Sequence, residues 1–139
     1  MNWTGKLRFV APGCAVLGAL LTTSCSTGIS ERDACEELVL YSDELAYSID
    51  GVGQNLDELS LRRPYAESMQ RLAEDLEQMD IADSELDTAV AEWSESIKVV
   101  AAHLRRSDRL FNDASYRTTI AGDVARMETQ ALRLLRLCG

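Results

Sequence analysis

The chain has 139 residues, with 23 acidic residues against 14 basic ones and a formal net charge of −9 at pH 7. Nucleic-acid binding needs an excess of Lys and Arg to neutralise phosphates, so this balance excludes nucleic acid as an expected partner. The length suits one compact domain.

Residues 1–24 have the composition of a targeting segment. Lys6 and Arg8 make its start positive, and a mainly apolar run of 13 residues follows from Phe9 to Leu21. A membrane-spanning helix needs about 20 apolar residues, so this run is too short to span a bilayer. We therefore predict that residues 1–24 are a signal peptide. Its removal leaves 115 residues with a net charge of −11, because it carries two basic residues and no acidic one.

Cys25 follows directly after the small polar residues 22–24. This arrangement resembles the lipobox of bacterial lipoproteins, roughly Leu-(Ala/Ser/Thr)-(Gly/Ala/Ser)-Cys, except that Thr22 stands where the pattern prefers Leu. The resemblance implies that Cys25 carries diacylglycerol on its sulfur and anchors the protein to the extracytoplasmic face of the cell membrane, with residues 25–30 as a short tether. A simple cleaved signal is the alternative; Cys14 is a poor rival because too little of the apolar run precedes it.

The first helix is predicted to begin at Ser30, because Ser30 and Asp33 have the spacing of a capping box. Apolar residues then recur at spacings of three and four through Gly51 and Gly53 as far as Leu59. This pattern predicts one long helix to about residue 61. A turn at the two glycines is the competing interpretation.

Three further helices follow from the same apolar periodicity. Pro64 suits the first turn of the second helix, and Asp83 or Ser84 can cap the third. The expected spans are residues 64–79, 84–104 and 116–138, with a partly helical connection at 107–115. Amphipathic helices with short connections favour an all-α fold, an antiparallel up-down-up-down four-helix bundle over residues 31–139.

In that topology, the start of the first helix lies beside the end of the last. Cys35 and Cys138 occupy these two places and are the only other cysteines of the mature chain. Such a pair is expected to be oxidised in an exported protein. The bridge would close a loop of about 100 residues and contribute about 4 to 5 kcal/mol in the chain-entropy account. Two buried free thiols are the alternative.

Four segments carry a broader resemblance: ACEEL, RRPYAESMQRLAEDLEQM, LDTAVAEWSESIKVVAAHL and LRLLRLC. They resemble small actinobacterial lipoproteins of unassigned function, which share a Cys near the first helix, a second helix that starts at Pro and a Cys at the end of the fourth. The likeness covers nearly the whole mature chain. It implies no activity and no catalytic residues.

Residues that carry catalysis or bind metals are scarce. A di-iron bundle needs Glu-x-x-His pairs, whereas the only histidine is His103 and position 100 is Val. We interpret His103 as a surface or boundary residue. Adjacent acids such as Glu36 and Glu37 point about 100° apart on a helix, so we interpret them as solvated faces and not as Ca²⁺ ligands. We expect no enzyme, no metal and no cofactor.

The expected function is that of a membrane-anchored, non-catalytic interaction or accessory module of the cell envelope. A helical-bundle carrier of an apolar ligand or lipid is the alternative. A carrier needs an open interior, and the apolar stripes contain enough large side chains to fill the interior of the predicted bundle.

Arginines gather near the two connections that the bundle places away from the membrane. The tether of residues 26–29 reaches at most about 20 Å, so the end with Cys35 and Cys138 is expected to face the membrane. The arginines at the other end either complement the dipoles of helix C-termini or bind an anionic wall polymer or an acidic envelope protein. They are Arg62, Arg63, Arg105, Arg106 and Arg109, with Arg117 as a further candidate.

Overall fold

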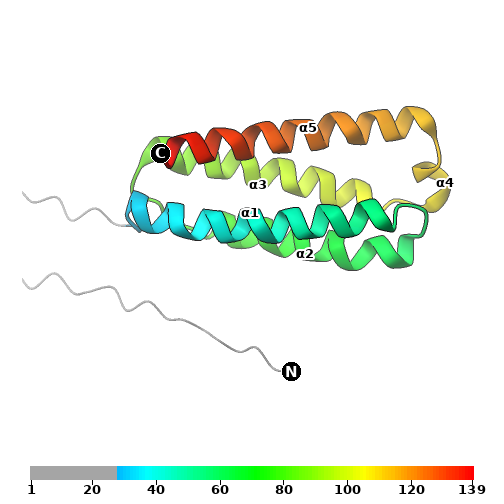
Figure 1. The fold of residues 1–139 in the computed structure, drawn as a ribbon, viewed down its shortest axis with the longest axis horizontal. Helices are drawn as coiled ribbons and strands as arrows, with labels where there is room; N and C mark the ends of the chain where they lie inside the picture. The colour runs from blue at the N-terminus through cyan, green and yellow to red at the C-terminus, as the bar shows by residue number, and fades with distance from the viewer. Residues whose placement is uncertain (1–27) are drawn as a thin grey trace, which may run out of the picture.

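The computed structural model of this protein describes residues 28–139, so the predicted signal peptide and the lipidation site Cys25 lie outside the described residues. The described chain is an all-α helical bundle. Figure 1 shows four long helices lying side by side, with the short α4 at one end. The helices are α1 (Glu31–Gln54), α2 (Leu59–Glu77), α3 (Ser84–Leu104), α4 (Asp108–Phe111) and α5 (Ala114–Leu137).

Side-chain caps begin three of the long helices. The Oγ of Ser30 accepts a hydrogen bond from the backbone N–H of Asp33, and a carboxylate oxygen of Asp83 accepts one from Leu86. Both predicted caps are therefore confirmed. Asp113 caps α5 in the same way and also accepts a hydrogen bond from the hydroxyl of Ser115. That hydrogen bond, followed by the backbone one, lowers the pKa of the Asp113 carboxyl.

The first helix ends earlier than the apolar spacing predicts. It runs through both glycines without a turn but stops at Gln54, so the predicted end near residue 61 is wrong. Asn55 ends the helix. Its side-chain amide donates a hydrogen bond to the carbonyl oxygen of Gly51 at 2.7 Å, and its backbone N–H donates one to the carbonyl oxygen of Val52. These bonds occupy carbonyls at the helix C-terminus, and the chain turns toward α2.

The second helix begins five residues before Pro64, and not at it. Its first residue, Leu59, donates its backbone N–H to the carboxylate of Asp108 at 2.7 Å, across 49 positions of sequence. A carboxylate at a helix N-terminus satisfies a free N–H and complements the dipole. Pro64 therefore lies inside α2, where it removes one backbone hydrogen bond.

The third helix is the centre of the bundle. It packs extensively against α2 and α5, and α1 packs against α2, whereas α1 and α5 contact each other at few points. Trp93 of α3 is buried among the core side chains of its neighbours. The connection after α3 contains the short α4, as the predicted partly helical segment required.

Cys35 and Cys138 form a disulfide, as predicted. Their Cα atoms lie 5.5 Å apart and their sequence separation is 103 residues. Cys35 lies in the first turns of α1 and Cys138 is the C-cap of α5. The bond therefore joins the two ends of the helical domain at one end of the bundle.

The same end holds the chain where it enters α1. The backbone N–H of Ile29 donates to the carbonyl oxygen of Asp80 at 2.7 Å, and Ala82 donates to the carbonyl oxygen of Ile29 at 3.1 Å. These bonds form an isolated parallel bridge between Ile29 and Ile81. Residue 29 is therefore fixed to the α2–α3 connection before the first helix begins.

Candidate functional site

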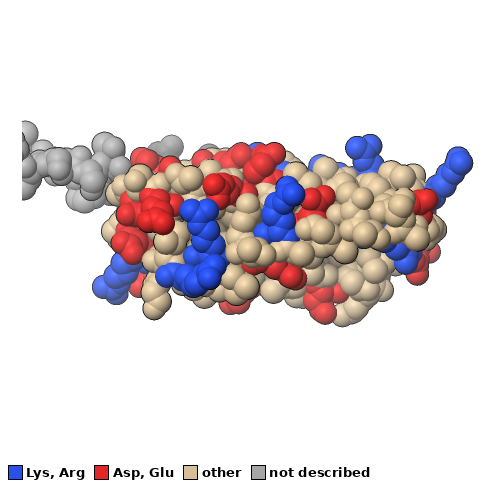
Figure 2. Space-filling model, turned by 90° about the horizontal axis from the view of Figure 1, so that it is seen from above, with Lys and Arg blue, Asp and Glu red and all other residues tan. Residues whose placement is uncertain are grey.

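The structure places the predicted arginines around the end of the bundle that carries α4, but not all of them on its surface. Arg63, Arg105, Arg106 and Arg109 are exposed. Figure 2 shows basic side chains projecting from the bundle at the end opposite the grey segment. Arg62 is fully buried, so it does not belong to a surface that could receive a partner.

Arg62 is buried because its guanidinium group satisfies carbonyl groups where helices end. It donates to the carbonyl oxygens of Leu56, Leu104 and Arg106 at 2.5, 3.3 and 2.9 Å. Two of these acceptors lie at or just after the C-terminus of α3, where carbonyls lack partners within the helix. The charge is therefore used inside the fold.

Two further contacts compensate the buried charge of Arg62. Its Nη1 lies 3.0 Å from a carboxylate oxygen of Asp108, the same residue that caps α2. Its Cζ lies 4.0 Å from the centroid of the Phe111 ring, within the range of a cation–π interaction. Arg62 therefore links α2, α4 and the end of α3 in one polar network.

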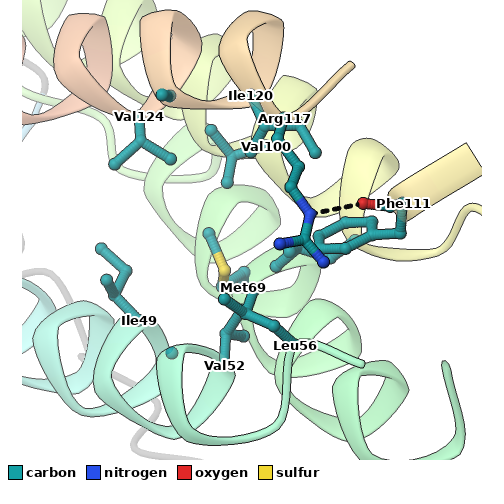
Figure 3. A pocket seen from close by; sticks show the side chains of 12 residues that line it. Ile49, Val52, Leu56, Met69, Val100, Phe111, Arg117, Ile120 and Val124 are labelled. Carbon is teal, nitrogen blue, oxygen red and sulfur yellow. Dashed lines mark hydrogen bonds between the residues drawn. The ribbon is translucent and has the colours of Figure 1, made fainter. Parts of the chain in front are cut away.

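An apolar pocket of about 260 Å³ lies beside this network. Figure 3 shows side chains of all four long helices, together with Phe111 of α4, around it. Eleven of its twelve lining residues are apolar or glycine: Ile49, Val52, Gly53, Leu56, Met69, Val100, Leu104, Phe111, Ile120, Ala121 and Val124. The apolar stripes fill the interior with buried side chains, Met69 and Val100 among them, and the pocket is a half-open hollow beside this core.

The pocket exists because α1 and α5 separate. Because α1 ends at Gln54, Leu56 lies in the turn that follows the helix, and its side chain lines the pocket there. Small residues face it from both sides: a methyl group added at Gly53 would meet no atom within 4 Å, and Ala121 is exposed. A hollow lined by such residues is the kind of site that takes an apolar ligand.

Two more hollows continue along the α1–α5 seam toward the disulfide. The middle hollow shares Ile49 with the pocket, and the next shares Ser42 and Ala131 with the middle one. Along α1 the seam runs from Leu38 to Gly53, about 22 Å at the rise of an α-helix. The hollow nearest the disulfide has only about 10 Å³, so the seam is open mainly at the pocket and at the middle hollow.

Arg117 of α5 is the one charged residue that lines the pocket. Its Nε donates to the carbonyl oxygen of Phe111 at 2.8 Å, and Figure 3 shows its side chain reaching down from α5 beside the Phe111 ring. Its Nη2 contacts Asp57 at 3.3 Å and the side chain of Asn112 at 3.2 Å. The backbone contact fixes the guanidinium group at the pocket.

His103 joins α3 to α5 and does not line the pocket. Its Nδ1 lies 2.7 Å from the hydroxyl of Tyr116, and its Nε2 lies 2.9 Å from a carboxylate oxygen of Asp123. The imidazole is partly buried, which agrees with the predicted boundary position. Both ring nitrogens have partners, so the histidine has a structural role that sequence spacing did not reveal.

Candidate metal-binding clusters and candidate membrane-spanning helices are both absent from the described residues. Within residues 28–139, no group of three or more His, Cys, Asp or Glu side chains is placed to hold a metal ion. No helix in that range combines the length and hydropathy of a membrane span.

No protein-family model matches this chain, and comparisons with curated proteins and with solved structures find no match.

Proposed function

We propose that this protein is a lipid-anchored, non-catalytic binding module of the bacterial cell envelope, and that it holds an apolar ligand between α1 and α5. Residues 1–24 direct export, Cys25 carries the lipid, and residues 31–139 form an antiparallel up-down-up-down bundle at the extracytoplasmic face. The Cys35–Cys138 disulfide supports an oxidising location outside the cytoplasm. Short connections between successive long helices support the alternating direction.

The observation that carries the binding proposal is the pocket of about 260 Å³ lined by eleven apolar or glycine residues and one arginine. The pocket is about half open to solvent, so part of its apolar lining is in contact with water. A ligand that covers this lining removes apolar surface from water, which is favourable. The pocket therefore favours the carrier over a module that acts through its surface alone.

The exposed arginines at the α4 end support a second, surface role. Arg63, Arg105, Arg106 and Arg109 are accessible and lie opposite the end where the chain enters the bundle. In a lipid-anchored protein this end is distal to the membrane. We propose that these arginines contact an anionic wall polymer or an acidic envelope protein while the bundle holds its ligand.

The anchor is tested by Cys25→Ser. Two acyl chains give stable membrane attachment, so the variant should move from the membrane fraction to the soluble fraction of cells. Ser26→Ala serves as the matched control and should stay with membranes. A Cys25→Ser protein that fractionates like wild type would overturn the anchor.

The pocket is tested with 1-aminoanthracene, a neutral apolar fluorophore whose emission rises on transfer from water to an apolar site. The Cys25→Ser chain keeps the whole helical domain and needs no detergent. Ala121→Trp on that background places an indole in the pocket and should abolish the signal, because Ala121 lines it. Thr118→Trp, also on the exposed surface of α5, should leave it unchanged. Equal signals from the two tryptophan variants would contradict binding in the pocket.

A further inference from the structure

We propose that the ligand is a single-chain amphiphile whose apolar tail fills the pocket and whose anionic head is bound by Arg117. This inference rests on the proposed function and adds the chemistry of the head group. A wholly apolar ligand needs only the apolar lining, whereas a charged residue at the edge of such a lining fixes the orientation of a ligand that has a polar end.

Arg117 retains the means to bind an anion. Its Nε and Nη2 are used by Phe111, Asp57 and Asn112. Among the described residues, Nη1 donates to no acceptor. A guanidinium N–H of this kind donates a charge-assisted hydrogen bond to a carboxylate or phosphate oxygen.

The existing ion pair of Arg117 does not compete strongly with a ligand. Its side chain is 47% exposed and that of Asp57 is 84% exposed. Exposed pairs of this type contribute little, because water screens both charges. The hydrogen bond to the carbonyl of Phe111, in contrast, holds the guanidinium at the pocket whether or not Asp57 is bound.

The charge of this end of the bundle also favours an anion. Residues 55–63 and 105–117 carry six arginines against four acidic residues, whereas the remaining described residues carry six basic and 19 acidic ones. Arg62 is paired with Asp108, whereas Arg63, Arg106 and Arg109 form no ion pair among the described residues. An anionic head at Arg117 thus lies in the least acidic part of a strongly acidic protein.

The size and shape of the pocket indicate one tail. Its volume of about 260 Å³ is below the usual range for drug-sized ligands, about 300 to 1,000 Å³, which leaves little room for two acyl chains. A longer tail can continue past Ile49 into the middle hollow of the seam. The ligand class is therefore an unbranched chain with a carboxylate or phosphate head.

Three probes that share one tail test this inference: dodecanoate, dodecyl phosphate and dodecanol. Their affinities are measured by displacement of 1-aminoanthracene from the Cys25→Ser chain. At least one anionic probe should bind the Cys25→Ser chain at least about tenfold more tightly than dodecanol does, on the scale of hydrogen bonds to charged groups. Whichever anion binds more tightly identifies the head as carboxylate or phosphate.

The matched variants are Arg117→Gln and Arg71→Gln. Arg117→Gln should lose the tenfold preference for anions and keep the affinity for dodecanol. Arg71 is an exposed arginine of α2 that does not line the pocket, so Arg71→Gln should bind all three probes as before. Anion binding that survives in Arg117→Gln would overturn the role of Arg117.

The outcomes separate the two proposals. Equal affinity of wild type for all three probes would refute the anionic head and leave the apolar pocket standing. Failure of all three probes to displace the fluorophore would refute the single-chain amphiphile and leave the apolar pocket standing. Failure of the fluorophore itself to bind in the pocket would refute ligand binding altogether. If Arg117→Gln also loses its affinity for dodecanol, the salt dependence of binding is measured on the Cys25→Ser chain with Arg117 intact. Added salt should weaken the binding of the anionic probes and leave the binding of dodecanol unchanged. An equal response of all three probes would refute the inference.

Discussion

The two ends of the bundle hold their helices together by different means. At one end the Cys35–Cys138 disulfide joins α1 to α5, and Ile29 is bonded to the α2–α3 connection. At the other end no disulfide within the described residues cross-links the helices. There the buried guanidinium of Arg62 bonds carbonyls from two connections and pairs with Asp108.

This difference accounts for the position of the pocket. The disulfide holds the ends of α1 and α5 together, and at the α4 end the two helices are free to lie apart. The Arg62 network holds α2, α3 and α4 together. Its hydrogen bond nearest to α1 goes to the carbonyl oxygen of Leu56, in the turn after that helix. A bundle that is cross-linked at one end and packed around a polar network at the other leaves room for a ligand between α1 and α5, which contact each other at few points.

The largest expected effect concerns the covalent end. Cys35→Ser should lower the free energy of unfolding by about 4 kcal/mol, because the bond closes a loop of 103 residues. Denaturant titration measures the change. Reduction of the wild type should give the same loss, and the reductant should have no effect on Cys35→Ser. A variant as stable as the oxidised wild type would show that the disulfide does not stabilise the bundle.

A somewhat smaller effect is expected at the polar end. Arg62→Leu should cost about 3 kcal/mol, because it leaves one buried and two partly buried carbonyls without their donor, at about 1 kcal/mol each. Arg63→Leu changes the neighbouring, exposed residue and should alter stability by less than about 0.5 kcal/mol. Equal effects of the two substitutions in thermal unfolding would contradict the role of Arg62.

The smallest effect compares two glycines of α1 near the pocket. A methyl group at Gly51 would overlap the ring of Tyr65, so Gly51→Ala should destabilise the protein by about 1 kcal/mol. The site of Gly53 is open, so Gly53→Ala should stabilise it by about 0.5 kcal/mol through helix propensity. Chemical denaturation resolves the opposite signs. Two changes of the same sign would mean that α1 does not pack on α2 and open to the pocket as described.

Local signals predicted the elements that depend on neighbouring residues. The spacing of apolar residues predicted the long helices, and Ser30 and Asp83 predicted the starts of two of them. The positions of Cys35 and Cys138, near the start of the first helix and the end of the last, predicted the disulfide. The boundary between α1 and α2 failed because Leu56 and Leu59 continue the apolar spacing past Asn55. Asn55 ends α1 by local hydrogen bonds that the apolar spacing does not reveal, and the carboxylate of Asp108, which bonds the first residue of α2, lies 49 residues away from Leu59.

The candidate site was harder to predict, because it depends on how helices are placed and not on their sequence periods. An arginine is expected on the surface by its chemistry, and Arg62 is buried because it bonds a carbonyl of the preceding turn together with two carbonyls more than 40 residues away, at the end of α3 and just after it. The pocket depends on the distance between α1 and α5, which no spacing of apolar residues encodes. Arg117 stood among the candidates for the exposed arginine cluster, and the structure adds its contact with the pocket.

The disulfide also determines how the domain responds to a pulling force. A chain pulled at residues 28 and 139 transmits tension through Cys35 and Cys138, so the loop between them carries no load. Only residues 28–35 and the terminal glycine can extend. After reduction the same pull acts on the whole loop, whose 103 residue steps can lengthen by up to about 350 Å. The oxidised domain is thus a short, inextensible link, and the reduced one is a long elastic chain.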